Sequence, residues 1–224
     1  GGLPRPSITA VIGASGAGTT SLCKKFIASS LLKGGRVFVA LGDEPPHHYV
    51  RHFESMNSFQ PHTYIENRRL FLTDIYGDFL KGLGIHDFGD LSSFGGVPID
   101  DMMLATRKFI AEQARSDKDF NIVVDSLTAL SPFIGLRDMH RVILGVQAVV
   151  SQNNHVIVYT AHEGALEGNL TQAIRQHADG VIRMRTHWVR GRLRREMIIE
   201  EMRFTEIKQP VLSYEITGEG VEIT

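Results

Sequence analysis

A glycine-rich segment, Gly13–Thr20, constrains the fold of this chain more than any other stretch. The apolar run before it, residues 8–12, is typical of a buried strand, and residues 22–31 place apolar side chains on one face of a helix. In a strand–turn–helix arrangement the glycines let backbone N–H groups turn toward an anion, and the helix N-terminus adds partial positive charge. The segment therefore predicts a fold that presents a phosphate-binding loop.

The segment matches the phosphate-loop pattern G-x-x-x-x-G-K-[ST] at all positions but one. Gly13 and Gly18 have the required spacing, and Thr20 stands at the Ser/Thr position. Thr19 stands at the lysine position, so the loop lacks its one charged residue. The residues predicted to contact a nucleotide are Gly13, Ala14, Ser15, Gly16, Ala17, Gly18, Thr19, Thr20 and Ser21.

Length, charge and cysteine content narrow the class of protein. The 224 residues suit one domain, predicted to span residues 1–224, and the abrupt start before a buried strand indicates that residues upstream are missing. The formal net charge of −1 gives no overall attraction to nucleic acid or an anionic membrane. Cys23 is the only cysteine, so a cytoplasmic location is expected, and no apolar run is long enough to predict membrane insertion.

Apolar runs alternate with helical patterns through the first three-quarters of the chain. Strands that are apolar throughout are typical of a parallel sheet with helices on both faces. They are predicted at residues 36–41, 70–74, 120–125 and 155–160. Residues 75–99 are rich in glycine and are expected to form a long flexible surface segment, followed by a helix over residues 100–115.

The last quarter of the chain has a different pattern, because its strands follow one another without helices. These strands are predicted at residues 180–185, 193–203, 211–216 and 220–223. Gly191 suits the turn of a hairpin between the first two. The sequence therefore predicts an α/β fold with a mainly parallel central sheet and a C-terminal antiparallel extension.

Three acidic residues follow predicted strands and are candidates for chemistry. Asp125 could hold Mg²⁺ together with the Thr20 hydroxyl, although an aspartate at a strand end is more often a cap when no phosphate loop is present. Asp43 and Glu44 could orient and deprotonate an attacking water, and capping of the next helix is an equally good interpretation.

Several segments, taken together and in order, resemble the RecA-superfamily ATPases of the KaiC-like branch. Asn121–Leu127 resembles the Walker B motif V-I-D-S-L of that family, and Ala178–Ile182 resembles its A-D-G-V-I. The other matching segments are residues 1–7, 13–20, 37–46, 197–203 and 214–220. The resemblance implies a RecA-like P-loop fold that binds ATP or ADP with Mg²⁺ between the subunits of a homo-oligomer such as a hexamer.

The chain departs from this family where charge matters. Thr19 replaces the Walker A lysine, and Gly42 and Asp43 stand where the family has two glutamates. Glu201 replaces the lysine of the family's K-M-R segment, whereas Arg203 remains and is implied to reach the nucleotide of a neighbouring subunit. Lys24 and Lys25 lie more than one helical turn beyond Thr19 and are not expected to replace the lost lysine.

These losses affect hydrolysis more than binding. A hydrogen bond to a charged group contributes about 1.5–3 kcal/mol, so losing the lysine should weaken nucleotide binding roughly ten- to a hundredfold. Removing one preorganised donor to the transition state costs about 10²–10³ in rate. We therefore expect a nucleotide-binding regulatory or scaffold protein, acting alone or with a partner ATPase or regulatory protein, that hydrolyses ATP very slowly or not at all.

Three other functions remain open from the sequence. The arginine-rich stretch 183–195 contains Trp188 and could contact single-stranded DNA, as a recombinase paralogue would. A subunit interface and a solvated hairpin are both better interpretations of the same stretch. The chain could also be a competent ATPase with an unconventional loop, or an assembly module that binds no nucleotide.

Overall fold

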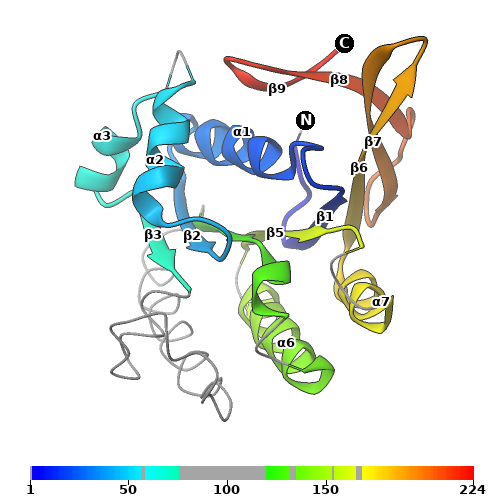
Figure 1. Ribbon diagram of the computed structural model, residues 1–224. Coiled ribbons are helices and arrows are strands. Elements are labelled where there is room, and N and C mark those ends of the chain that lie inside the picture. Colours follow the sequence, from blue (N-terminus) through cyan, green and yellow to red (C-terminus); the bar gives the residue numbers. More distant parts are fainter. Residues whose placement is uncertain (1, 57–58, 76–119, 132–134, 153, 165–167) are drawn as a thin grey trace, which may run out of the picture.

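A nine-stranded sheet organises the part of the chain described by the computed structural model, which comprises residues 2–56, 59–75, 120–131, 135–152, 154–164 and 168–224 (Figure 1). The strands are β1 (Ser7–Gly13), β2 (Arg36–Leu41), β3 (Leu70–Asp74), β4 (Phe120–Asp125), β5 (Val156–His162), β6 (Gly180–Val189), β7 (Arg192–Met202), β8 (Val211–Thr217) and β9 (Gly220–Ile223). The helices are α1 (Thr19–Leu32), α2 (Pro46–Glu54), α3 (Pro61–Glu66), the 3₁₀ turn η2 (Leu127–Leu130), α6 (Leu136–Gln152) and α7 (Gly168–His177).

The strand order is β3-β2-β4-β5-β1-β6-β7-β8-β9. Strands from β3 to β6 in this order pair in parallel, and β6 to β9 pair as antiparallel neighbours. This arrangement confirms the predicted parallel sheet with its antiparallel extension. Because the parallel strands point the same way, the carboxyl ends of β1, β2, β4 and β5 meet at one edge, where open α/β sheets bind ligands.

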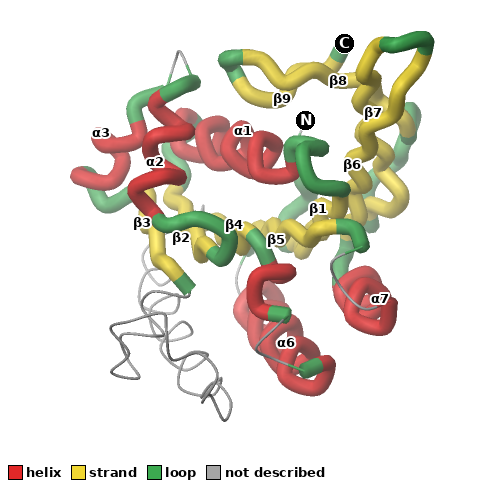
Figure 2. Tube along the Cα trace, in the orientation of Figure 1, coloured by secondary structure: helices red, strands yellow, loops and turns green. Residues whose placement is uncertain are grey.

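Helices cover both faces of the parallel strands, as predicted: α1, α2 and α3 lie on one side, and α6 and α7 on the other (Figures 1 and 2). Along β1, Ile8 belongs to the apolar core that includes Ile143 of α6 and Ile174 of α7. Val11 belongs to the opposite core, together with Ile27 of α1. Every residue of β1 is buried, which explains why its side chains are apolar apart from Ser7 and Thr9. None of the described helices is both long and apolar enough to cross a membrane.

The predicted bounds of β2, β3, β4 and β9 agree with the structure residue for residue. The sequence patterns do not predict α3 or α7. Helix α3 has only 6 residues, too few for an apolar period, and among the described side chains of α7 only Ala173 and Ile174 are buried. The predicted flexible segment at 75–99, apart from Ile75, and the predicted helix at 100–115 lie outside the described residues.

The C-terminal strands bring distant residues to the carboxyl edge of the sheet. A two-residue turn with φ of 49° at Arg190 and 75° at Gly191 joins β6 to β7 and is of the kind that favours tight hairpins. Strands β8 and β9 then cross above α1 (Figure 1). The Lys25 ammonium on α1 donates to the carbonyl oxygen of Glu219 at 2.8 Å. The hydroxyl of Tyr214 on β8 donates to the carbonyl oxygen of Ala17 in the glycine-rich loop.

The bond between Tyr214 and Ala17 should contribute measurably to stability. In the variant Tyr214→Phe, a buried carbonyl oxygen loses its donor, so the free energy of unfolding should fall by about 1–2 kcal/mol in urea denaturation. Tyr64→Phe is the matched control, because no hydrogen bond of the Tyr64 hydroxyl is seen among the described residues. Equal effects of the two substitutions would contradict the proposed contribution.

Candidate functional site

The loop between β1 and α1 has the backbone of an anion-binding turn. Gly16 and Gly18 have φ of 79° and 94°, in the left-handed region that side chains other than glycine rarely adopt. Gly18 is also the N-cap of α1, and its carbonyl oxygen accepts the first helical hydrogen bond, from the Leu22 N–H at 2.9 Å. The helix N-terminus and the turned backbone therefore lie together at the carboxyl end of β1.

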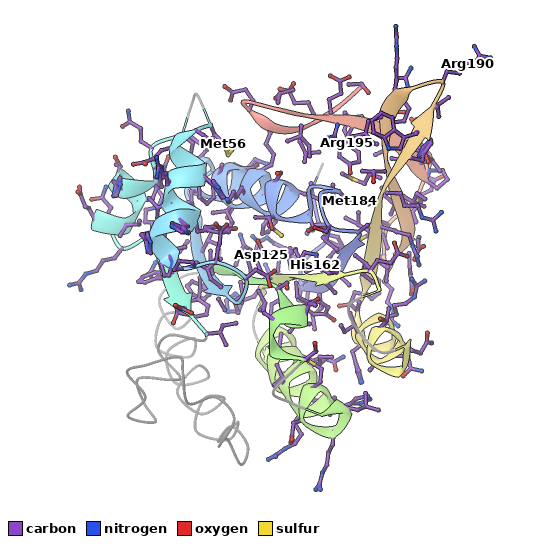
Figure 3. All side chains as sticks on the ribbon, in the orientation of Figure 1. Met56, Asp125, His162, Met184, Arg190 and Arg195 are labelled. Atoms are coloured by element: carbon purple, nitrogen blue, oxygen red, sulfur yellow. The ribbon has the colours of Figure 1, made fainter. Side chains whose placement is uncertain are left out.

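Thr19 lies beneath this loop and brings no charge to it. It is buried, and its methyl group lies 3.0 Å from the position that a Cβ on Gly13 would take. The same Cβ would lie 2.9 Å from the carbonyl oxygen of Met184 on β6, so the start of the loop requires glycine. Figure 3 labels Met184 beside the loop.

A cavity of about 520 Å³ lies next to the loop and brings together the predicted acids. Thr20, Asp43, Glu44 and Asp125 all line it, so side chains from α1, β4 and the turn after β2 meet in one place. Its other lining residues are Ser21, Lys24, His52, Ser55, Met56, Ile216, Thr217, Gly218 and Gly220.

Asp125 is the most buried acid of the cavity, at 4 % exposure (Figure 3). Its Oδ1 accepts hydrogen bonds from the hydroxyls of Thr160 at 2.6 Å and Thr20 at 3.3 Å. Its Oδ2 is buried and has no partner in the described part of the chain. Mg²⁺ prefers oxygen ligands, so an unpartnered carboxylate oxygen beside the Thr20 hydroxyl fits this ion.

Burial raises the pKa of the Asp125 carboxyl above its ordinary value of 3.8, although hydrogen bonds from Thr160 and Thr20 oppose the rise. The ionised form therefore destabilises the folded protein at pH values above 3.8. This cost reaches its full size once the pH exceeds the raised pKa. The charge of Asp125 thus lowers the free energy of unfolding, which is typical of a residue kept for binding or catalysis.

The other two acids are held by bases of the same chain. The Nε2 atom of His162, at the end of β5, lies 3.0 Å from Oδ2 of Asp43 (Figure 3). Glu44 contacts the Lys24 ammonium at 3.4 Å and Nδ1 of His52 at 3.2 Å. A carboxylate engaged in this way is poorly suited to accept a proton from water unless the contact is first broken.

The structure gives a steric reason for Gly42, where the resembling family has an acid. A Cβ on Gly42 would lie 2.7 Å from the Cβ of Ala129 and 2.9 Å from the carbonyl oxygen of Ser126. These neighbours belong to η2 and to the residue that precedes it, directly after Asp125. A larger residue at position 42 would therefore displace the turn that follows the metal-binding candidate.

Arg203 is not part of this cavity. Its side chain is half exposed, with Nη1 at 3.3 Å from Oδ1 of Asp179 and Nε at 3.5 Å from Oε1 of Glu201. Both partners lie near the start of β6, whereas the loop follows the carboxyl end of β1. Within one chain, the structure therefore does not bring Arg203 to the loop.

Several cavity residues are missed by sequence reasoning. Lys24 lines the same cavity as Thr20, whereas sequence reasoning considers it only as a replacement for the lost lysine. Its spacing of four residues from Thr20 on α1 is a signal that could have placed both on one helix face. Thr217, the last residue of β8, and Gly218, directly after it, come from the far end of the chain and carry no local signal.

Comparison with known proteins gives consistent results. A family model described as the ATPase KaiC matches residues 1–224. The UPF0273 protein SSO1861 of Saccharolobus solfataricus is 29 % identical over 228 residues, which cover 99 % of this chain and 76 % of that protein. The UPF0273 protein PH0284 of Pyrococcus horikoshii is 25 % identical over 236 residues, covering 99 % of this chain and 87 % of the relative.

Two solved structures share the fold. The KaiC-like protein PH0186 of Pyrococcus horikoshii superposes with a TM-score of 0.76 at 18 % identity, covering 100 % of this chain and 92 % of that one. The flagellar accessory protein FlaH of Methanocaldococcus jannaschii gives the same TM-score of 0.76 at 17 % identity, with the same coverage of 100 % and 92 %. At this level of identity the likeness concerns the fold alone.

The raised pKa of Asp125 predicts how its replacement changes stability with pH. Asp125→Asn removes the buried charge, so the Tm at pH 7.5 should rise by about 2–4 °C. The gain should shrink as the pH falls toward 4, because the wild-type carboxyl then takes up its proton in the folded protein.

Scanning calorimetry between pH 4 and 8 measures this dependence. Asp138→Asn, at a more exposed acid on α6, is the control and should show no such trend. A gain in Tm that is the same at pH 4 and pH 7.5, or a loss at pH 7.5, would contradict the assignment of a costly buried carboxylate.

Proposed function

The chain belongs to the KaiC family of ATPases, and we propose that it is a member that binds ATP or ADP with Mg²⁺ but hydrolyses ATP very slowly or not at all. In this proposal the bound nucleotide controls assembly or partner contact, and the protein works in the cytoplasm as a regulatory or scaffold protein in signal transduction. The contacts of Asp125 support nucleotide binding. The contacts that hold Asp43 and Glu44 to basic side chains support slow hydrolysis.

The observation that carries the proposal is the pairing of Thr20 with Asp125 beside a loop without a cation. Thr20 and the unpartnered Oδ2 of Asp125 would hold Mg²⁺. When bound, this ion would supply positive charge to the phosphates. The turned backbone of Gly13–Thr20 would supply N–H donors to the same phosphates.

Slow hydrolysis follows from the groups that surround the loop and the Thr20–Asp125 pair. The loop brings no side-chain charge to the phosphates, because Thr19 is buried and neutral. Asp43 is held by His162 and Glu44 by Lys24, so neither candidate base is free in the described structure. Each missing preorganised group costs about 10²–10³ in rate, and the effects of two such losses would leave little turnover.

A second copy of the chain would be needed to bring an arginine such as Arg203 to the nucleotide. Arg203 lies away from the loop of its own chain and keeps half of its side chain exposed. We propose a homo-oligomer such as a hexamer, in which this residue faces the site of the neighbour. The adjacent Glu201, also half exposed, would then place a negative charge near that site and oppose hydrolysis further.

Restoring the lysine tests the proposal directly. The wild type should bind Mg-ATP in calorimetric titration. It should release phosphate from ATP at a rate close to that of ATP in buffer without protein. Thr19→Lys should tighten binding by roughly ten- to a hundredfold, because a charge-assisted contact is regained. It should restore little turnover, because Asp43 and Glu44 keep their partners.

The outcomes separate the remaining functions of this site. If neither the wild type nor Thr19→Lys gives binding heat at millimolar nucleotide, the protein is an assembly module that binds no nucleotide. Phosphate release by the wild type at ordinary ATPase rates would identify a competent enzyme with an unconventional loop. Thr19→Ser, which adds no charge, is the control and should leave the affinity unchanged.

Single-stranded DNA binding is a second candidate function, favoured by the tip of the β6–β7 hairpin. Trp188 is 72 % exposed there, and Arg190 points away from the rest of the molecule (Figure 3). Arg192 and Arg194 are also exposed, and neither is in an ion pair in the described part of the chain. Exposed arginines beside an aromatic ring suit the backbone and bases of a single strand.

A gel shift at low salt measures this activity. If the hairpin binds DNA, Arg192→Gln with Arg194→Gln should weaken binding at least about tenfold and reduce its salt dependence. Arg51→Gln with Arg137→Gln, at exposed arginines on α2 and α6, is the control of equal charge. The absence of a shift, or equal effects of the two double variants, would exclude this function for the hairpin.

A further inference from the structure

Lys24 is an unusual side chain for the interior of α1. Only 7 % of the side chain is exposed, and its ammonium lies over the ring of Tyr49 at 4.3 Å and 5.8 Å from the ring centre of Phe53. Lysine is almost never buried unless it is paired. Burial lowers the pKa of Lys24, and the nearby Glu44 opposes this change. Lys24 meets the condition of pairing through Glu44, at 3.4 Å, and the two residues place a charged pair at the wall of the cavity.

The ammonium borders the cavity beside the phosphate loop. Lys24 follows Thr20 by one helical turn and lines the same cavity of about 520 Å³ as Thr20 and Asp125. Among the described residues that line this cavity, Lys24 is the single lysine or arginine. In that part of the chain its one hydrogen bond is to Glu44, at 3.4 Å, so two of its three donors remain.

The charges of the cavity show what this ammonium could do. Asp43, Glu44 and Asp125 place three carboxylates on its wall, and the phosphates of a nucleotide would add further negative charge. In most phosphate loops, Mg²⁺ and the loop lysine share the task of balancing these charges. Here the lysine is absent from position 19 and a buried lysine stands at position 24.

We infer that Lys24 partly compensates for Thr19: its ammonium offsets part of the negative charge of the cavity, so that Mg²⁺, although it still binds at Thr20 and Asp125, adds little to the affinity for a nucleoside diphosphate or triphosphate. The inference rests on the nucleotide binding proposed above and adds the residue that sets its metal dependence. The Lys24 ammonium lies beside the acids of the cavity, whereas the ammonium of a lysine at position 19 would lie at the glycine-rich loop.

The test compares ADP affinity in EDTA with ADP affinity in saturating Mg²⁺, by calorimetric titration. The wild-type dissociation constants in the two buffers should differ by less than about tenfold. Lys24→Met keeps the length of the side chain and removes its charge. It should weaken binding in EDTA by roughly ten- to a hundredfold, because the three carboxylates then lose their balancing cation.

In Mg²⁺ the same variant should change affinity by less than about threefold, because removal of a competing cation strengthens metal binding to the acids. Adding Thr19→Lys to Lys24→Met returns a charge from the loop side and should restore binding in EDTA. Lys33→Met, at an exposed lysine at the C-terminal end of α1, is the matched control and should behave as the wild type.

The outcomes distinguish this inference from the proposed function. A wild type that binds ADP in neither buffer refutes both. In another outcome, the wild type binds ADP while the ratio of its dissociation constants in EDTA and in Mg²⁺ is the same as in Lys24→Met. That result refutes the role of Lys24 and leaves the proposed nucleotide binding standing. If circular dichroism shows that Lys24→Met does not fold, Glu44→Gln serves instead. This variant frees the Lys24 ammonium from its partner, so ADP should bind more tightly in EDTA. Weaker ADP binding would overturn the inference.

Discussion

Strand β1 pairs in parallel on both sides, with β5 and with β6, and this double pairing holds the phosphate loop in place. Its last residue, Gly13, stands opposite His162 on one side and Met184 on the other. The N–H of Glu163 donates to the Gly13 carbonyl oxygen at 2.9 Å, so β5 also fixes the first residue of the loop. Because β4 pairs with β5, the same register carries Asp125 to the loop and within reach of the Thr20 hydroxyl.

Two of the three acids beside the loop contact basic side chains of the same chain. Each acid of the turn after β2 has a base as its partner, and these bases come from different elements: Lys24 from α1, His52 from α2 and His162 from β5. A ligand that enters the cavity must exchange these contacts rather than simply add to them. Asp125 is the exception, because its Oδ2 has no partner in the described residues, and the cost of burying its charge would be offset by a bound cation.

Sequence patterns predict the parallel sheet well, because strands buried on both faces must be apolar throughout. They also predict that the loop and Asp125 meet, since the carboxyl ends of parallel strands share one edge. They do not predict the partner of Asp43, because His162 is 119 residues away and its position depends on how β2 and β5 are spaced in the sheet. Lys24 is missed for a different reason: sequence reasoning considers it only as a replacement for the loop lysine, although its spacing of four residues from Thr20 places both on one helix face.

The bond from Tyr214 to Ala17 links two residues that are 197 positions apart in the chain. Ile216 lies against Gly18 of the loop as well, and together with Thr217, Gly218 and Gly220 it lines one side of the cavity. During synthesis on the ribosome, the strands from β1 to β6 can therefore complete the parallel sheet while the cavity still lacks one of its walls. That wall forms only after β8 and β9 have left the exit tunnel.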